Sequence, residues 1–247
     1  MKRFLSKNKE NNCFLIENTE NNHLKNVLRQ MPGDEIEVVG FDESVYVCKI
    51  TEILKNYSIA EILEKKACFA NPKKDLTVFQ ALVKNDNMNL IVQKLSEVGV
   101  TTLIPFESEF ITAKDSKNKN GKLQEIANQS IKQCKRSIPL KVENTISFKD
   151  LLKKLANFDY VLFANEQEDA YPLKDALKCI VSKGIENTRI ALVVGSEGGF
   201  SVKEIEELKK LSNLKSFTLG KRILRAETAT IALTSVVMFA MGEWNYE

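Results

Sequence analysis

The chain has 247 residues, of which 43% are hydrophobic and 28% charged. This is the composition of an ordinary globular protein, and it excludes a disordered or fibrous chain. Its 36 Lys and Arg against 33 Asp and Glu leave a formal charge of +3, too small a surplus to indicate a nucleic-acid-binding protein by itself. The basic residues are concentrated, however: residues 111–141 carry eight basic and two acidic side chains, whereas residues 1–70 carry ten and eleven. Such a patch can attract a polyanion, although a lysine-rich segment is more often a solvated surface.

The sequence predicts no membrane segment, disulfide framework or metal site. The N-terminal residues turn polar at once, and the longest uncharged run, 228–242, is shorter than the roughly 18–20 residues that span a bilayer. The five cysteines are odd in number, widely spaced and never arranged as CxxC, and His23 is the single histidine. We therefore expect a protein of a reducing compartment, the cytoplasm.

The first 70 residues follow a strand-like pattern after one short helix. Residues 23–29 place Leu24, Val27 and Leu28 on one helical face, and alternating segments follow at 35–39, 44–50 and 57–63. Short strands with tight turns predict a small β-barrel or sandwich. The polar, proline-containing segment 71–75 is the expected domain boundary.

Beyond residue 75 the pattern changes to strands that alternate with helices. Such alternation predicts βαβ units and a mostly parallel sheet, hence an α/β domain. The last helix is apolar nearly all round, so we expect it to be buried on more than one side, in the core or at a subunit interface. The expected strands are 76–83, 101–105, 160–164, 189–194 and 216–219, and the expected helices are 87–98, 122–135, 173–181, 202–211 and 228–241.

A glycine-rich loop with the sequence VGSEGGFS (194–201) follows the most apolar of these strands. Ligands of open α/β sheets bind at strand carboxyl ends, where glycines let the backbone approach a ligand closely. The loop matches neither GxxxxGK[ST] nor GxGxxG, which disfavours nucleoside triphosphates and NAD. Ser201 and Glu204 have the spacing of a capping box for the next helix. A tight turn without a ligand remains an alternative, but Glu197 suits a cationic or hydroxyl-bearing ligand.

A basic turn with the sequence LGKRILRAETA (219–229) comes between a strand end and the last helix. Lys221, Arg222 and Arg225 gather within five positions, where a helix N-terminus adds positive potential. This clustering favours phosphate recognition; the alternative is a solvated turn in which Glu227 pairs locally. His23 lies away from both loops and Cys134 has no histidine to act as its base, so we assign neither a catalytic role.

With both loops considered, the sequence resembles the RsmE family of 16S rRNA uridine-N3 methyltransferases, of the SPOUT superfamily. The family loop GPEGG-F-S corresponds to residues 195–201, and its highly specific LG-x-RILR-x-ETA string to residues 219–229. The match runs nearly end to end. Further shared segments are a His-x-x-x-VLR helix (23–29) followed by Gly33-Asp34, a QK-x-x-E-x-G helix (93–99) with Pro105 downstream, and a Gln-x-x-Arg segment before a proline (133–139).

The resemblance implies a PUA-like, RNA-binding β-barrel in residues 1–70 and a SPOUT methyltransferase domain in residues 71–247. It also implies a deep trefoil knot in the second domain, a homodimer, and S-adenosylmethionine bound in the knot. The homodimer would bury the second face of the last helix. The residues expected to bind the cofactor are Phe163, Ala164, Asn165, Gly195, Ser196, Glu197, Gly198, Gly199, Leu219, Gly220, Ile223, Leu224, Arg225 and Ala229.

The chain departs from the family pattern at three positions. Ser196 replaces the proline of GPEGG, Phe110 replaces an arginine expected to touch RNA, and Lys132 replaces an acidic residue. The GSEG string is also found in ribose 2′-O-methyltransferases of the superfamily, but those carry an Asn-Val-Ser stretch at the last helix, where this chain has ETA.

The reaction implied is methylation of N3 of one uridine, the uracil-1498 type position, in 16S rRNA of the small subunit. N3 lies on the Watson–Crick edge, so the base must be unpaired or swung out. We expect Arg225 to hold the uracil or its phosphate and to stabilise the developing imidate, and Glu197 or Glu227 to orient the base or relay its proton. Residues expected to contact the rRNA backbone are Arg29, Lys114, Lys122, Lys132, Arg136, Lys221 and Arg222.

Two alternatives remain open from the sequence. One is a SPOUT enzyme that methylates a ribose or another base, which the identity of the product would distinguish. The other is a ribosome-assembly or RNA-binding factor that keeps the fold without catalysis, which would not bind S-adenosylmethionine.

Overall fold

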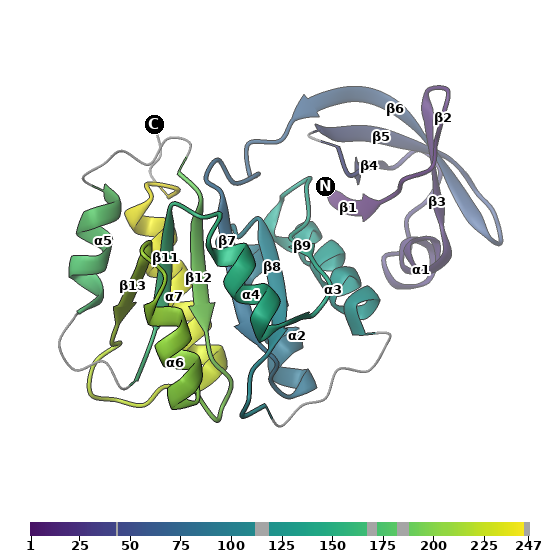
Figure 1. Cartoon of the computed structure of the whole chain (residues 1–247). Coiled ribbons are helices and arrows are strands. Elements are labelled where there is room, and N and C mark those ends of the chain that lie inside the picture. The colour runs from purple at the N-terminus through teal and green to yellow at the C-terminus, as the bar shows by residue number, and fades with distance from the viewer. Residues whose placement is uncertain (43, 112–118, 167–171, 182–187, 245–247) are drawn as a thin grey trace. The chain divides into compact units, whose positions relative to one another are not determined.

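The computed structural model describes residues 1–42, 44–111, 119–166, 172–181 and 188–244 (Figure 1). The chain forms two compact units. Unit 1 contains Met1–Asn71 and Gln129–Pro139, and unit 2 contains Pro72–Asn128 and Leu140–Glu247. The first break falls at the edge of the polar segment 71–75. Nothing in the sequence pattern indicates that residues 129–139 belong with the N-terminal unit.

Unit 1 is built on a six-stranded sheet. Its strand order is β1 (Lys2–Leu5), β4 (Glu35–Val39), β5 (Ser44–Ile53), β6 (Tyr57–Ala67), β3 (Cys13–Glu17) and β2 (Lys9–Glu10). The β1–β4 pair is parallel and the other pairs are antiparallel. Inward residues of these strands form one core, among them Phe4, Phe14, Ile16, Ile36 and Val38. Strands β1 to β3 were not expected from the sequence.

The helix expected at 23–29 begins earlier and is irregular. It consists of α1 (Asn18–Asn22) and a single π-helical turn, His23–Val27, closed by the Leu28 amide donating to the His23 carbonyl at 2.9 Å. Arg29 then adopts a left-handed φ of 51°, which ends the helix. Leu24 is fully buried, whereas Val27 is exposed, so the expected apolar face is only partly used.

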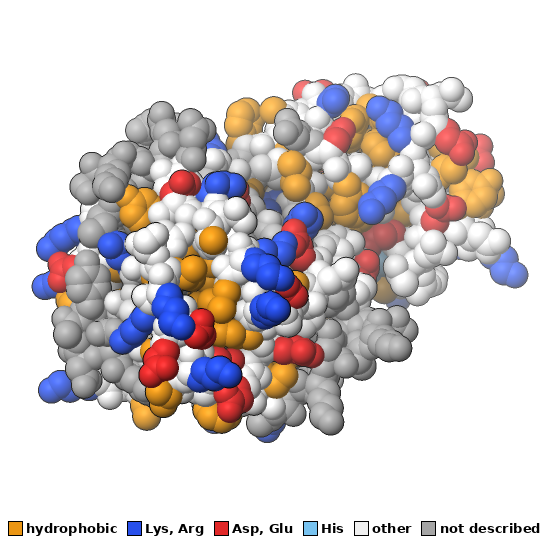
Figure 2. Space-filling view, viewed as in Figure 1, with side chains coloured by type: hydrophobic (Ala, Val, Ile, Leu, Met, Phe, Trp, Pro, Cys, Tyr) orange, Lys and Arg blue, Asp and Glu red, His pale blue; other side chains and the backbone are white. Residues whose placement is uncertain are grey.

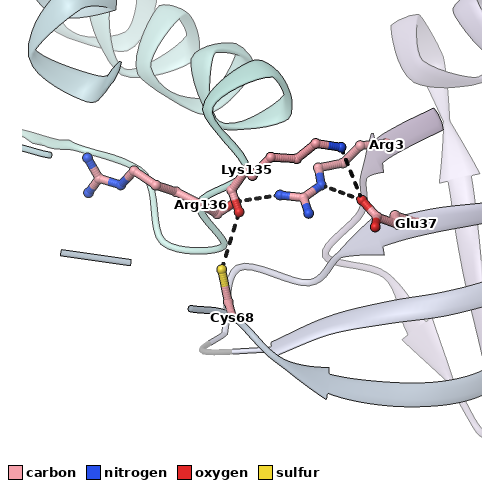
Figure 3. Close-up of polar contacts among 5 residues, drawn as sticks. All are labelled: Arg3, Glu37, Cys68, Lys135 and Arg136. Carbon is pink, nitrogen blue, oxygen red and sulfur yellow. Dashed lines mark hydrogen bonds and ion pairs between the residues drawn. The ribbon is translucent and has the colours of Figure 1, made fainter. Parts of the chain in front are cut away.

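The segment 129–139 is fixed to unit 1 by charged side chains. The buried carboxylate of Glu20 accepts from Lys132 Nζ at 2.7 Å and from the Leu5 amide at 3.1 Å. Figure 3 shows a second group: Glu37 Oε2 lies 2.9 Å from Arg3 Nε and 3.6 Å from Lys135 Nζ, and Arg3 Nη1 donates to the Arg136 carbonyl at 3.2 Å. Burial alone would raise the pKa of the Glu37 carboxyl, but the Arg3 hydrogen bond and the charges of Arg3 and Lys135 hold that pKa below its usual value.

Unit 2 contains a seven-stranded sheet in which every pair is parallel, which confirms the expected α/β class. Its main order is β10 (Ile146–Ser147), β8 (Thr102–Glu107), β7 (Leu76–Ala81), β12 (Ile190–Val194), β11 (Tyr160–Ala164) and β13 (Leu214–Phe217), and β9 (Lys141–Val142) also pairs with β8. Central strands of such a sheet are buried on both faces. In β12, Ile190, Leu192 and Val194 enter one core, and Ala191 and Val193 the other.

Helices cover both faces of this sheet. One core receives α2 (Asn85–Val98), α5 (Leu173–Val181), α7 (Ala226–Ala240) and the first part of α3 (Lys119–Cys134). The other core receives α4 (Phe148–Leu155) and α6 (Val202–Lys209). In Figure 1, α4 and α6 lie in front of the sheet and α2 and α7 behind it. Helix α4 was not expected from the sequence.

Helix α7 buries only one of its apolar faces within the chain. Leu233, Val237 and Met238 are buried, whereas Phe239 and, after the helix, Trp244 are 64% and 47% exposed. The single chain therefore leaves an apolar surface on its last helix. Within the described ranges, no helix is both long and apolar enough to cross a membrane.

Candidate active site

A cavity of about 670 Å³ lies at the carboxyl ends of β11, β12 and β13. Parallel strands end at the same edge of a sheet, so the segments that follow these three strands meet there. The lining comes from residues 164–166, the glycine-rich loop, the basic turn and the first turn of α7. Asn165 is fixed at this edge because its backbone amide donates to the Phe217 carbonyl of β13 at 3.0 Å.

Most of the expected cofactor residues lie together in this cavity. Twelve of the fourteen line it; Phe163 and Gly198 do not. Phe163 is fully buried and packs edge-on against Phe200, with ring centroids 5.0 Å apart. Sequence reasoning missed Glu166, Phe200 and Ile205, which also line the cavity.

The glycine-rich loop packs closely against its neighbours. Its turn is closed by the Gly199 amide, which donates to the Ser196 carbonyl at 3.1 Å. A Cβ on Gly195 would lie 2.9 Å from the Phe200 ring, and Gly199 has a left-handed φ of 68°. Both positions therefore favour glycine, one for space and one for conformation. Gly195, Ser196, Glu197 and Gly199 of this loop line the cavity.

Ser196 and Gly198 hold the loop against the segment that follows β8. The Ser196 hydroxyl lies 3.3 Å from the Phe110 carbonyl oxygen, to which it can donate, and 3.3 Å from the Gly198 amide, from which it accepts. The expected capping box of α6 is confirmed, and its Glu204 carboxylate also accepts from the Glu109 amide at 2.9 Å. The side chain that replaces the family proline is thus a hydrogen-bonding link between two loops.

Cations lie at the rim of the cavity. Lys221, Arg222 and Arg225 are exposed, line the cavity, and form no ion pair with any part of the chain that the structure describes. Arg225 is the N-cap of α7, and its carbonyl accepts from the Ala229 amide at 2.8 Å. The backbone of Arg225 therefore lies at a helix N-terminus, where positive potential accumulates.

The two carboxylates considered for proton relay have different positions. Glu197 is exposed in the cavity wall, and Asn87 Nδ2 donates to its Oε1 at 3.4 Å. Glu227, in the first turn of α7, does not line the cavity, and its Oε2 is buried without a hydrogen-bond partner among the described residues. Of the two, only Glu197 faces the cavity.

The residues expected to contact RNA differ in their exposure to solvent and in their partners. Arg29 in unit 1 and Lys122 in unit 2 are exposed, and Lys114 lies outside the described residues. Lys132 is neutralised by Glu20. Arg136 is 2% exposed and its Nε donates to the Ile138 carbonyl at 3.0 Å. The phosphate contact expected of Arg136 therefore disagrees with the structure, because this guanidinium is not presented to solvent.

Charge on the face over α4 and α6 is mixed. Figure 2 shows Lys and Arg side chains interspersed there with Asp and Glu. On α4, Asp150 pairs with Lys153 at 2.8 Å, and Glu207 of α6 pairs with Lys210, the residue that follows the helix, at 2.5 Å. Interspersed charges give a weak field, so this face is a poor site for a polyanion.

Comparisons with known proteins agree with this architecture. An RNA methyltransferase domain model matches residues 70–238, and an RNA methyltransferase PUA domain model matches residues 16–63. The fold and site are therefore those of an RNA methyltransferase with an N-terminal PUA domain.

Full-length relatives identify the family. Ribosomal RNA small subunit methyltransferase E of Mesomycoplasma hyopneumoniae is 32% identical over 94% of this chain and 97% of its own length, and that of Aquifex aeolicus 30% identical over 95% and 98%. A crystal structure of the enzyme of that name from Neisseria gonorrhoeae, bound to S-adenosyl methionine, superposes with a TM-score of 0.85 at 25% identity over 97% of each chain. The chain belongs to the ribosomal RNA small subunit methyltransferase E family, which confirms the resemblance and the assignment as an enzyme.

The contact between Gly198 and Phe110 yields a direct test of the loop packing. A Cβ at residue 198 would lie 2.7 Å from the Phe110 carbonyl oxygen, a backbone atom that cannot rotate away. We expect Gly198→Ala to lower the free energy of unfolding by about 1–3 kcal/mol. Gly121→Ala is the control, because no atom lies within 4 Å of a Cβ there. In helix α3 it should stabilise by about 0.5–1 kcal/mol.

Urea unfolding of both variants measures the difference. Wild-type stability in Gly198→Ala would contradict the close contact between the two loops.

Proposed function

We propose that this protein transfers a methyl group from S-adenosylmethionine to N3 of a uridine in 16S rRNA of the small ribosomal subunit. The observation that carries the proposal is the cavity at the carboxyl edge of the parallel sheet, with a glycine-rich wall, carboxylates and a rim of three cations. Membership of the methyltransferase E family supports the class of reaction, and the S-adenosyl methionine bound to the Neisseria gonorrhoeae relative supports the cofactor.

The residues present fit this cofactor. A volume of about 670 Å³ is in the range of small-molecule sites, roughly 300–1,000 Å³. Leu219, Leu224 and Ala229 offer apolar surface for an adenine, and Gly195 and Gly199 line the same cavity. Glu166 and Glu197 supply negative charge that suits the cationic sulfonium and ammonium groups. When bound, the cofactor supplies an electrophilic methyl group.

Arg225 has the chemistry and position to activate the uracil. Uridine N3 is a weakly acidic imide and becomes a good nucleophile only when its proton leaves. A guanidinium beside a helix N-terminus stabilises the negative charge that then develops on the uracil oxygens. We infer that Glu197, which faces the cavity, orients the base or accepts the imide proton, and that Glu227 does not touch it.

Exposed cations of each unit are available to bind the rRNA backbone. Lys221 and Arg222 lie at the rim, and Arg29 and Lys122 are exposed elsewhere. Contacts of this kind to phosphates are salt-dependent and set affinity more than sequence choice. They suit a substrate whose target base is already unpaired or is swung out.

We infer in addition that the enzyme is a homodimer and that its α/β chain forms a trefoil knot, as the resemblance implies. The exposed apolar residues Val236 and Phe239 of α7, with Trp244 beyond its end, support the dimer, because contiguous apolar surface marks interaction sites. We also infer that the protein acts in the cytoplasm, because the proposed substrate is ribosomal RNA.

Product analysis tests the proposal. The purified protein would be incubated with isotopically labelled S-adenosylmethionine and small subunits that lack the modification, and the digested rRNA analysed by mass spectrometry. We expect labelled 3-methyluridine. A labelled 2′-O-methylnucleoside would contradict the N3 assignment and make Ser196 the better indicator of reaction class, whereas absence of both methyl transfer and cofactor binding would support a non-catalytic factor.

Kinetics of Arg225→Ala test the assigned role of that residue. Loss of the guanidinium should lower the rate at saturating substrates by about 10²–10³-fold, because it removes stabilisation of the developing imidate. The Kd for S-adenosylmethionine should stay within about threefold of wild type, since the lost interaction acts in the transition state. Lys149→Ala, an exposed position on α4, is the control for loss of one positive charge. An unaltered rate in Arg225→Ala would exclude the role.

A further inference from the structure

A fully buried glutamine occupies the central strand β7, among apolar neighbours. Gln80 is 0% exposed, as are Leu76, Val78, Phe79 and Ala81 on the same strand. A primary amide in such a place is unfavourable unless its polar atoms find partners. The Gln80 side chain forms three hydrogen bonds, each to a protein atom.

The partners of Gln80 determine its orientation. Its Nε2 donates to the carbonyl oxygens of Gly195 and Ala81, both at 3.0 Å. These oxygens can only accept, so the amide nitrogen must face them. Oε1 therefore faces α7, where it accepts from the Thr230 hydroxyl at 2.5 Å.

Gln80 links two walls of the cavity, the glycine-rich loop and α7, from a position outside the cavity. Gly195 belongs to the glycine-rich loop. Thr230 follows Ala226 and Ala229 on α7, and both of these alanines line the cavity. The Thr230 hydroxyl is also 2.8 Å from the Ala226 carbonyl. Gln80 and Thr230 do not line the cavity themselves. Gly195 and Thr230 lie 115 and 150 residues after Gln80 in the sequence.

Other interactions hold the surrounding elements without this pair. The parallel ladder places Val194 opposite Gln80, and α7 packs through Leu233, Val237 and Met238. What the pair adds is a fixed separation between the Gly195 carbonyl and the first turn of α7. A site held in one geometry before binding loses less entropy when the ligand arrives.

We propose that Gln80 and Thr230 are positioning residues that preorganise the S-adenosylmethionine pocket by holding the glycine-rich loop to the start of α7. This role rests on the proposed cofactor. It places two residues outside the cavity among the determinants of cofactor affinity.

A matched pair of threonines on α7 makes the test sharp. Thr230 and Thr234 are one helical turn apart and both 0% exposed, but the Thr234 hydroxyl has no hydrogen-bond partner within the described part of the chain. Thr230→Val and Thr234→Val thus remove the same hydroxyl at nearly the same volume, and only the first breaks the link to Gln80.

Isothermal titration of S-adenosylmethionine into the full-length variants gives the readout. Thr230→Val should raise the Kd about tenfold, the effect of losing one hydrogen bond to a buried acceptor. Thr234→Val should leave the Kd within about twofold, and Thr230→Ser, which keeps the hydroxyl, should recover most of the affinity. Gln80→Met combined with Thr230→Val should weaken binding by less than the product of the two single effects, since both break one link.

The outcomes separate this role from the cofactor assignment. Unchanged affinity in Thr230→Val beside a wild-type protein that binds would overturn the positioning role alone. Equal loss of affinity in both valine variants would also overturn it, because the effect would then follow from packing. Failure of wild type and Thr234→Val to bind would overturn the cofactor assignment and this role with it.

Discussion

Strands β13, β11 and β12 run parallel, with Phe163 of β11 paired to Val193 on one side and to Ser216 on the other. Because all three strands end at one edge, the glycine-rich loop, the basic turn and residues 164–166 must meet there, although they are far apart in sequence. The apolar cores on both faces of the sheet keep this edge rigid. Every chemical feature of the site depends on that pairing.

The loops supply complementary chemistry at this edge. Gly195 and Gly199 form part of the cavity wall, Glu166 and Glu197 bring negative charge, and the basic turn brings positive charge next to the N-terminus of α7. A cationic methyl donor and an anionic polymer can thus approach one cavity by different walls. Ser196, within the glycine-rich loop, links it to the segment after β8, and Gln80, outside the cavity, links the loop to α7.

The features that depend on local pattern could be predicted from the sequence. The strand at 190–194 was evident because five consecutive apolar residues suit a strand buried on both faces, and the capping box of α6 is a spacing of three residues. The cavity was predictable because glycines and cations followed strand ends. Strands β1 and β3 were missed because their sequences, KRFL and CFLIE, do not alternate strictly, so their role becomes evident only in pairing with β4 and β6. Helix α4 has a local signal in the sequence, because Ser147 and Asp150 have the spacing of an N-cap, and the Ser147 side chain accepts from the Asp150 backbone amide.

Long-range contacts were beyond reach of the sequence. Gln80 looks like one polar residue in an apolar strand until Gly195 and Thr230 are placed beside it. The sequence predicts that Lys132 and Arg136 contact RNA. In the structure Lys132 is paired with Glu20, and the Arg136 side chain is buried. Gly195 and Thr230 lie more than 100 residues from Gln80 in the sequence, as Glu20 does from Lys132, and the burial of Arg136 follows from tertiary packing.

We infer that the edge formed by β11, β12 and β13 is the cofactor site of this enzyme. A crystal structure of the protein grown with S-adenosylmethionine tests it most directly. We expect electron density for the cofactor between the glycine-rich loop and the basic turn, in contact with Gly195, Leu219 and Ala229. Density for the cofactor in any other place, with this cavity holding only solvent, would contradict it.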